Sequence, residues 1–386
     1  MNFERSGIVK KVAIITLNGY FNHGNRLQNY ALQQAIESLG FSVETLIVRN
    51  ETPQQSVGES EGQKSAQISV NINLVKSLRI WLWKIRNRRN LANLNNERTA
   101  LFKKFTSDFI HESSITVSEK SIDETYCANF DFFVTGSDQV WNPMYSGGSG
   151  LYFLYFVPPH KRIAYAPSFG VSRIPDPLQK NYRRWISEIE HISVRENDGA
   201  RICKELTGKD VPVVLDPTML LSADDWQKII YKQMPVQQGI LLTYFLGEVS
   251  VEYRKIIQNF ANLRNLKIVN LSDIKDKKAY VSGPSQFVGL IRDAQLFCTD
   301  SFHGTVFSII FHTPFVVFKR SAIHGSSMFS RLETLLKTFD LEHRVFENLD
   351  IEDVFHVDFG HVDDILAIQK KASYQFLAES LGIEEN

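Results

Sequence analysis

The residues best placed for chemistry lie in the stretch 294–310, where a predicted strand meets a predicted helix. Residues 294–298 form a short apolar run typical of a buried strand, and from Thr305 the apolar residues recur at helical spacing. His303 and Gly304 therefore fall at a helix start, where free backbone N–H groups and the helix dipole favour an anion. A histidine there could hold the anion and deliver a proton, or it could only cap the helix.

Other polar residues follow other predicted strands, and they share guanidinium, amide or ammonium groups. They are Arg26, Gln28, Asn29, Gln139, Asn142, Arg195, Lys319 and Arg320. Such groups suit a small, multiply charged anion, because arginine binds carboxylate and phosphate through two parallel hydrogen bonds. The sequence shows no metal-ligand spacing, no cysteine–histidine pair and no nucleophile-elbow motif, so we expect neither a metal site nor a bound cofactor.

The elements that carry these residues alternate between strand and helix. The β-branched run 12–17 predicts a buried strand, followed by a polar loop, an amphipathic helix that stops at Gly40, and a strand at 41–48. The loop is not Gly-x-Gly-x-x-Gly and lacks a phosphate-loop lysine, so ordinary dinucleotide and NTP sites are not indicated. Further strands are expected at 130–135, 211–218, 240–245, 266–271 and 314–320.

This pattern predicts an α/β fold with two Rossmann-like domains and a ligand cleft between them. A chain of 386 residues exceeds one ordinary core. We place the N-terminal domain at 1–218, with a basic helical insertion at about 70–110, and the C-terminal domain at 219–360. Residues 361–386 are expected to form a helix that packs back across the junction.

Composition indicates a globular protein of a reducing compartment. Lys plus Arg and Asp plus Glu balance at 43 each, so the net charge gives no argument for nucleic acid. Three scattered cysteines argue against a disulfide framework. The first residues lack a signal-peptide pattern, and no apolar run is long enough to span a bilayer. We therefore expect a cytoplasmic protein.

One segment, 74–90, combines basic charge with tryptophan. Its apolar stripe comprises Leu78, Trp81, Leu82 and Ile85. A helix of this kind either lies on an anionic membrane surface or packs on its own domain with a solvated basic face. The sequence leaves both interpretations open.

Five motifs in order resemble those of the polysaccharide pyruvyl transferase family. They are Gly-Asn-Arg-Leu-Gln-Asn-Tyr-Ala-Leu (24–32), Gly-Ser-Asp-Gln-Val-Trp-Asn (136–142), Ser-Val-Arg-Glu (193–196), Leu-Asp-Pro-Thr (215–218) and Asp-Ser-Phe-His-Gly (300–304). The likeness runs from residue 12 to about 320. It implies a GT-B-like arrangement, as in two-domain glycosyltransferases. It also implies transfer of the enolpyruvyl group of phosphoenolpyruvate to sugar hydroxyls, which forms pyruvate ketals on bacterial surface polysaccharides and exopolysaccharides.

The resemblance also implies residue roles. Arg195 matches an arginine that grips the anionic donor, and His303 matches the expected general acid. Lys319 resembles a donor-binding lysine, although Arg320 could be its true counterpart. The helix start from Ser301 to Gly304 is expected to bind the donor's anionic groups. The remaining candidates are assigned to the cleft or the acceptor: Asn25, Arg26, Gln28, Asp138, Gln139 and Trp141.

Several of these assignments leave alternatives. Packing and capping explain Gln28, Asn29 and Trp141 as well as ligand binding does, and Asp138 could act as a base or an acceptor ligand. The whole chain could instead be a GT-B-type glycosyltransferase using a nucleotide sugar, or a non-catalytic sugar- or anion-binding protein. A lipid-linked oligosaccharide acceptor at the inner membrane face would give the basic tryptophan segment a purpose.

Overall fold

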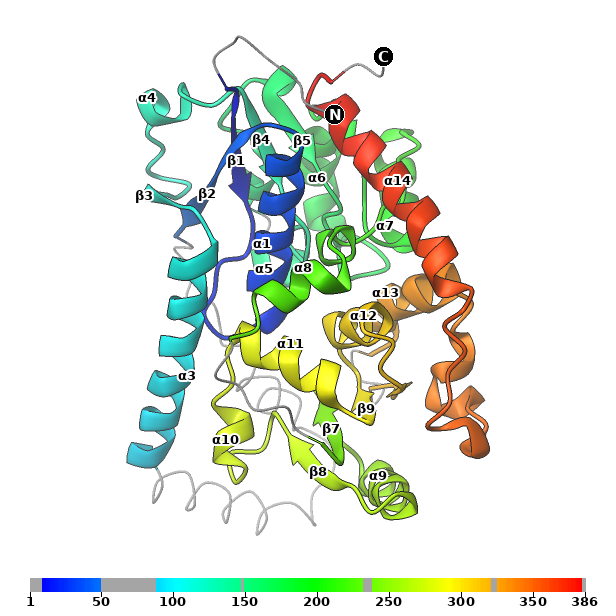
Figure 1. Cartoon of the computed structure of the whole chain (residues 1–386). Helices are drawn as coiled ribbons and strands as arrows, with labels where there is room; N and C mark the ends of the chain where they lie inside the picture. The colour runs from blue at the N-terminus through cyan, green and yellow to red at the C-terminus, as the bar shows by residue number, and fades with distance from the viewer. Residues whose placement is uncertain (1–8, 50–87, 147–148, 232–237, 321–324, 384–386) are drawn as a thin grey trace.

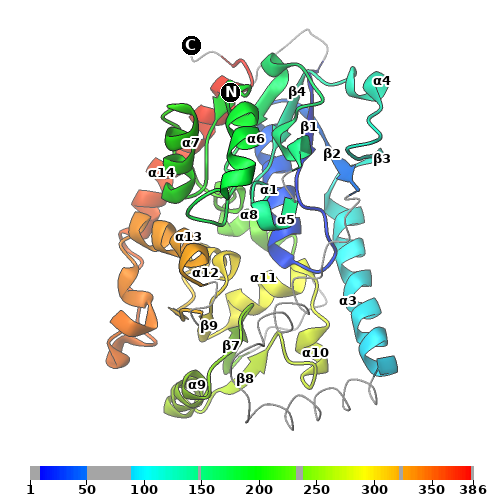
Figure 2. The ribbon, with the colours of Figure 1, turned by 180° about the vertical axis from the view of Figure 1, so that it is seen from behind.

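The computed structural model describes residues 9–49, 88–146, 149–231, 238–320 and 325–383 (Figure 1). Within them, two parallel β-sheets lie in the two halves of the molecule, with helices on both faces of each (Figures 1 and 2). The basic segment 74–90 falls outside the described residues as far as residue 87.

The first sheet has six parallel strands in the order β3-β2-β1-β4-β5-β6. The order reverses beside β1, which is the position where ligands collect in Rossmann-like sheets. The strands are β1 (Lys11–Ile15), β2 (Ser42–Val48), β3 (Glu112–Val117), β4 (Phe132–Thr135), β5 (Arg162–Ala164) and β6 (His191–Ile192).

The second sheet has four parallel strands in the order β10-β9-β7-β8. They are β7 (Ile240–Tyr244), β8 (Lys267–Asn270), β9 (Leu296–Thr299) and β10 (Phe315–Val317). Every residue of β7 and β9 is buried, as expected for parallel strands covered on both faces. The predicted α/β fold with two Rossmann-like units is therefore confirmed, while the exact domain limits stay a prediction.

The helices fall into two groups, one before the second sheet in the chain and one that begins after β7. Those before the second sheet are α1 (His23–Ser38), α3 (Arg88–Phe109), α4 (Glu124–Cys127), α5 (Pro143–Ser146), α6 (Asp176–Ser187), α7 (Asn197–Thr207) and α8 (Ala223–Lys228). Those that follow are α9 (Val251–Leu263), α10 (Lys277–Tyr280), α11 (Pro284–Asp293), α12 (Phe302–Ile310), α13 (Gly325–Thr338) and α14 (Val362–Ser380).

One predicted strand, 211–218, is largely wrong. Its pairing reduces to a single bridge between Val194 and Val213, and the chain then forms a short 3-10 helix, Pro217–Leu220. The physical reason is proline: Pro212 and Pro217 have no backbone N–H to donate to a sheet.

The two halves share one continuous apolar core. Trp226 of α8 lies between Tyr30 of α1, at 5.7 Å between ring centroids, and Phe307 of α12, at 4.8 Å. The Trp226 side chain is fully buried, and its Nε1–H donates to the carbonyl of Thr218. This packing holds α1 and α12 together on opposite sides of Trp226.

Two long helices connect the halves at opposite sides (Figure 1). From the first half, α3 runs down to α10, where the Tyr280 hydroxyl donates to Asn95 at 2.7 Å. On the other side, α14 lies against the first half: the Leu215 N–H donates to Ser373 Oγ at 3.0 Å. No helix among the described residues is long and apolar enough to cross a bilayer.

Candidate functional site

The turn between β9 and α12 is tied to both of its neighbouring strands. Asp300 accepts hydrogen bonds from the backbone N–H groups of Leu246 and Gly247, which follow β7, at 2.7 and 2.8 Å. Its Oδ2 also accepts from Arg320 Nε, after β10, at 2.8 Å. Three strand ends of the second sheet therefore hold the start of α12 in place.

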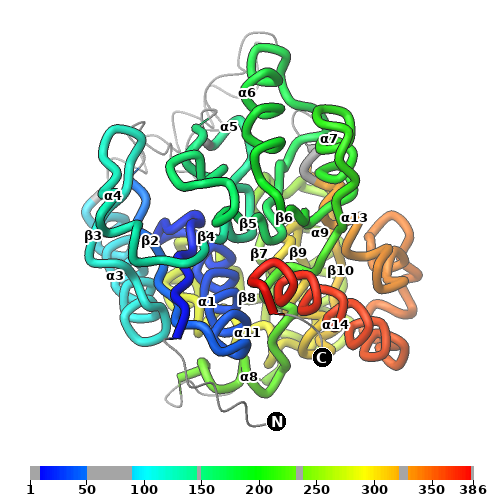
Figure 3. The backbone as a smooth tube through the Cα atoms, turned by 90° about the horizontal axis from the view of Figure 1, so that it is seen from above, coloured from blue at the N-terminus to red at the C-terminus, as the bar shows by residue number. Residues whose placement is uncertain are grey.

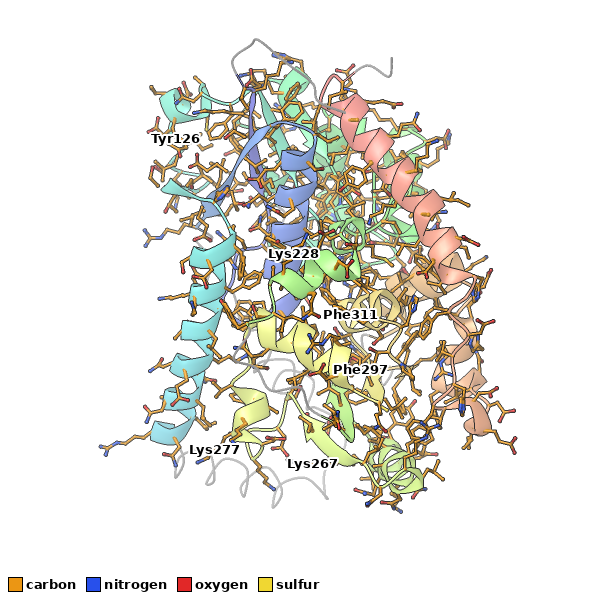
Figure 4. The ribbon with its side chains drawn as sticks, in the orientation of Figure 1. Tyr126, Lys228, Lys267, Lys277, Phe297 and Phe311 are labelled. Carbon is orange, nitrogen blue, oxygen red and sulfur yellow. The ribbon has the colours of Figure 1, made fainter. Side chains whose placement is uncertain are left out.

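The first turn of α12 is capped by a serine side chain. Ser301 is the N-cap, and its Oγ accepts the Gly304 N–H at 3.3 Å. Gly304 lies against Phe297 of β9, labelled in Figure 4, and a Cβ at this position would be 2.7 Å from that ring. A glycine is required because α12 approaches the strand beneath it so closely.

His303, in the same turn, is 93% buried and faces the other half of the molecule. Its Nε2 lies 3.5 Å from Oδ2 of Asp216, an ion-pair distance without a well-aligned hydrogen bond. The other face of the ring rests on the first turn of α1, where a Cβ at Gly24 would be 2.1 Å from His303 Nδ1. The imidazole is thus held between α1 and a carboxylate.

Asp216 is the centre of the site and is completely buried. Its Oδ1 accepts from the N–H and hydroxyl of Thr218, and its Oδ2 accepts from Ser137 Oγ at 2.8 Å. Burial alone would raise the pKa of Asp216, but His303, then Arg195 and Thr218, hold it well below its ordinary value. Asp216 is therefore an anion at neutral pH.

Arg195 approaches Asp216 from the end of β6. Its Nη1 donates to Asp216 Oδ2 at 2.8 Å, and its guanidinium stacks on the Phe302 ring at 4.3 Å. Burial lowers its pKa, but the carboxylates of Asp216, Asp138 and Glu196 together raise it, so the group is always charged. The Nε and Nη2 atoms are buried and have no hydrogen-bond partner among the described residues.

Two further carboxylates flank that unpaired edge of Arg195 at longer range. Asp138 Oδ1 lies 3.6 Å from Nη2, and Glu196 Oε2 lies 3.9 Å from Nε. The other carboxylate oxygen of Glu196 accepts from the Ser168 hydroxyl and the Phe169 N–H, both at 2.9 Å. Asp138 has a left-handed backbone, with φ 70°, which turns the chain after β4 towards the site.

A cavity of about 320 Å³ adjoins this cluster. Its wall includes Arg195, Asp216 and Phe302, and side chains of α13 and α14 close the other side. Figure 3 shows α13 beside α7, the helix that begins directly after Glu196. The cluster thus borders a space large enough for a small organic anion.

The two basic residues after β10 differ in position. Arg320 is half-buried and bound to Asp300, as described above. Lys319 is exposed, and its Nζ lies 5.3 Å from the ring of Phe329. The described contacts do not bring Lys319 to His303 or Arg195.

Arg26 is bound away from this cluster. Its Nη1 donates to Glu112 at 2.8 Å, its Nη2 donates to the carbonyl of Asn18, and its guanidinium lies over the Tyr20 ring. The side chain is fully buried. Arg26 thus holds the loop between β1 and α1 on the edge of the first sheet.

The amides of α1 also bond locally. Gln28 donates to Thr16 Oγ1 at 2.7 Å and to the carbonyl of Asn25 at 2.9 Å, and Asn29 donates to Thr45 Oγ1. Asn25 is buried in the first turn, next to the glycine that contacts His303. These bonds fix the start of α1 on β1 and β2.

Of the residues after β4, Trp141 lies in the core of the first half. It is fully buried, its Nε1–H donates to the carbonyl of Tyr152, and its ring stacks on Phe153 at 4.7 Å. Gln139 is partly exposed, and its Oε1 accepts from Asn142 Nδ2 at 2.7 Å. Trp141 therefore supports the loop from behind, whereas Gln139 reaches its surface.

Two members of the cluster, Asp216 and Glu196, were not among the predicted site residues, and neither was Arg331, a buried residue of α13 that interacts electrostatically with Arg195 and Glu196. The signal for Asp216 was present, since it stands in the Leu-Asp-Pro-Thr motif, but an aspartate before proline is also ordinary turn chemistry. Glu196 stands beside Arg195 in its motif. Arg331 sits inside a helix, where a basic residue normally faces solvent.

We expect Gly24→Ala to disable the site by displacing His303. The added methyl group would overlap the imidazole, and a shift of about 1 Å in a catalytic group can cost on the order of a hundredfold in rate. The measurement is kcat, which should fall at least about tenfold.

The matched control is Gly40→Ala at the other end of α1. Gly40 has φ +90° and open space around it, so alanine there should lower stability but leave kcat intact. Normal turnover in Gly24→Ala would show that the imidazole can move without consequence.

Within the described residues, no group of three or more His, Cys, Asp or Glu side chains is arranged to hold a metal ion. The cluster instead consists of arginines, carboxylates and one imidazole.

A family model, polysaccharide pyruvyl transferase, matches residues 22–321 of the chain. No curated protein matches the sequence. Among solved structures, S. aureus MnaA in complex with UDP is 12% identical, with a TM-score of 0.48, covering 97% of this chain and 98% of that one. The glycotransferase of kitacinnamycin is 12% identical, with a TM-score of 0.40 and the same coverage. Likenesses this distant carry no argument about what the chain binds.

Proposed function

This chain belongs to the polysaccharide pyruvyl transferase family, and we propose that it transfers the enolpyruvyl group of phosphoenolpyruvate to sugar hydroxyls. The product would be a pyruvate ketal formed during bacterial surface polysaccharide or exopolysaccharide biosynthesis. The observation that carries the proposal is one buried cluster: His303 and Arg195, from different halves, meet on the same carboxylate oxygen of Asp216.

The donor would bind through its two anionic groups. Arg195 offers Nε and Nη2, the side-on edge of a guanidinium, which matches the two oxygens of a carboxylate. The start of α12 adds the helix dipole from Ser301 to Gly304. Phe302 keeps the guanidinium plane in place by stacking. A cavity lined by Arg195, Asp216 and Phe302 adjoins this cluster.

His303 would act as the general acid. It gives its proton to the methylene carbon of phosphoenolpyruvate, and the electron pair of the carbon–carbon double bond forms the new C–H bond. The central carbon then has oxocarbenium character and is attacked by a sugar hydroxyl, which loses its proton. Asp138 is our candidate base for that proton, and the carboxylate of Asp216 holds the imidazole in position.

Ketal closure follows from loss of phosphate. The C–O bond to phosphate breaks with its electron pair on phosphate, and a second sugar hydroxyl attacks the same carbon and loses its proton. Of the two hydroxyl protons, one replaces the proton that His303 gave to carbon and the other leaves with the phosphate. The overall change converts phosphoenolpyruvate and a sugar diol into the ketal and inorganic phosphate, so no oxidant or reductant is required. Lys319 and Arg320 remain donor-binding candidates at the end of β10.

Donor choice can be tested by protection against thermal unfolding. Phosphoenolpyruvate should raise the Tm, and uridine or guanosine diphosphate sugars should not, because a buried arginine edge suits a small acid. A rise with a nucleotide sugar alone would indicate a glycosyltransferase. Release of inorganic phosphate on adding a glycan acceptor would separate the enzyme from a non-catalytic anion-binding protein.

We further propose that the acceptor is lipid-linked and that residues 74–90 contact the inner face of the cytoplasmic membrane. The segment joins basic charge to Trp81 and Trp83. Replacing both tryptophans with serine should release the protein from anionic vesicles and leave its Tm unchanged. If the variant and the wild type bound the vesicles equally, the alternative interpretation would hold, in which this segment packs on its own domain.

A further inference from the structure

Arg331, on α13, is a buried arginine whose Nε has no hydrogen-bond partner. Its exposure is 6%, and among the described residues it makes neither a hydrogen bond nor an ion pair. Burying a charge without a partner is expensive. A buried arginine that the fold retains at this cost is expected to bind a ligand.

Among the described residues, the other buried arginines each donate at least one hydrogen bond to the protein, although Nε of Arg26 also lacks a partner. Arg344 donates to four backbone carbonyls, and Arg162 donates to Glu188 and to two carbonyls. Arg26 is paired with Glu112. Arg331 therefore differs from arginines that only support the fold.

Its position places it at the described cluster. One turn further along α13, Thr334 Oγ1 accepts the N–H of Asn197, which directly follows Glu196. Burial and then the like charge of Arg195 lower the pKa of Arg331 to about 10; Arg320 adds to this, and Glu196 and Asp138 oppose it. Even so, Arg331 remains protonated at neutral pH.

Arg195 and Arg331 suit different anionic groups. The Nε and Nη2 edge of Arg195 makes no hydrogen bond, although Asp138 and Glu196 lie 3.6 and 3.9 Å away, and its two parallel N–H groups suit a planar carboxylate. Arg331 has Arg320 as a cationic neighbour, and a phosphoryl group with up to two negative charges suits a site of two cations better than a carboxylate does. No carboxylate among the described residues is hydrogen-bonded to Arg331, whereas Arg320 is already bound to Asp300.

We propose that Arg331 binds the phosphoryl group of the donor while Arg195 binds its carboxylate. This assignment rests on the proposed function, because it takes phosphoenolpyruvate as the donor. It makes Arg331 a residue that selects a phosphorylated acid over its unphosphorylated counterpart.

The test is Arg331→Met, which keeps much of the side-chain volume and removes the charge. Calorimetric titration should show phosphoenolpyruvate affinity reduced about ten- to a hundredfold. Protection against thermal unfolding by inorganic phosphate should be lost, and protection by pyruvate should be retained. Without ligand, the Tm should stay the same or rise, because an uncompensated buried charge has been removed.

Arg254→Met on α9 is the control, since it removes the same charge from an exposed residue that donates only to the Val249 carbonyl. It should leave all three ligands unaffected. Arg331→Lys, which keeps the charge, should restore part of the phosphate protection.

Three results would overturn the assignment. They are unchanged phosphoenolpyruvate affinity in Arg331→Met, equal loss of pyruvate and phosphate protection, or a lowered Tm with phosphate protection intact. The last would make Arg331 a counter-charge for Glu196 and Asp138. Failure of the proposed function looks different, because the wild type itself would then bind neither phosphoenolpyruvate nor phosphate.

Discussion

His303→Gln is expected to bind phosphoenolpyruvate almost normally and to lose turnover by about a hundredfold or more. Glutamine keeps a polar side chain of similar reach but has no proton to give at neutral pH. The loss should therefore appear in kcat, with a small change in the donor's Kd. Single-turnover release of phosphate and calorimetric titration of the donor measure the two quantities separately.

The matched control is His312→Gln, just beyond the other end of α12. His312 is exposed, pairs with Asp363 at 3.1 Å and stacks on Phe359. This variant should keep full turnover. If His303→Gln turned over at nearly the wild-type rate, the proton would have to come from another group, and the contact between His303 and Asp216 would have no part in the reaction.

Arg195→Ala is expected to weaken donor binding at least about a hundredfold, since two charge-assisted hydrogen bonds are removed. Arg195→Lys should recover little of this affinity, because an ammonium group cannot reproduce the side-on edge. The Kd of phosphoenolpyruvate, measured on protein shown to be folded, checks both variants.

Stability must be measured alongside, because Arg195 also neutralises buried Asp216. Removing one partner of a buried pair costs about 3–5 kcal/mol, and Arg195→Lys separates that cost from the loss of the donor contact. Arg162→Ala is the control: this arginine starts β5, away from the site, and pairs with Glu188 at 2.8 Å. It should lower the Tm without changing the donor's Kd. Equal donor affinity in wild type and Arg195→Ala would show that Arg195 does not bind the donor.

Much of the fold follows from local patterns in the sequence. The β-branched run at β1, the helix that stops at Gly40 and the apolar run of β9 each predicted the element that forms there. The exception, 211–218, shows the limit of such patterns. Its residues are apolar enough for a strand, but Pro212 and Pro217 remove donors that the ladder needs.

The site was only partly predictable. His303 and Arg195 stand at element ends, where sequence already suggests ligand contacts. Their meeting at Asp216 depends on how the halves dock, which the packing of Trp226 between α1 and α12 decides. Trp141 was predicted as a cleft residue, but its indole packs in the core of the first half. Arg331 could not be found at all, because its burial arises only when α13 packs beside α7.

The central claim is that the chain joins phosphoenolpyruvate to a sugar with release of phosphate. The most direct measurement is mass spectrometry of lipid-linked glycans incubated with the protein and phosphoenolpyruvate. The account predicts a glycan heavier by one pyruvic acid less one water, with matching phosphate release, and neither change with His303→Gln. Transfer of a sugar from a nucleotide donor, with phosphoenolpyruvate left unconsumed, would contradict it.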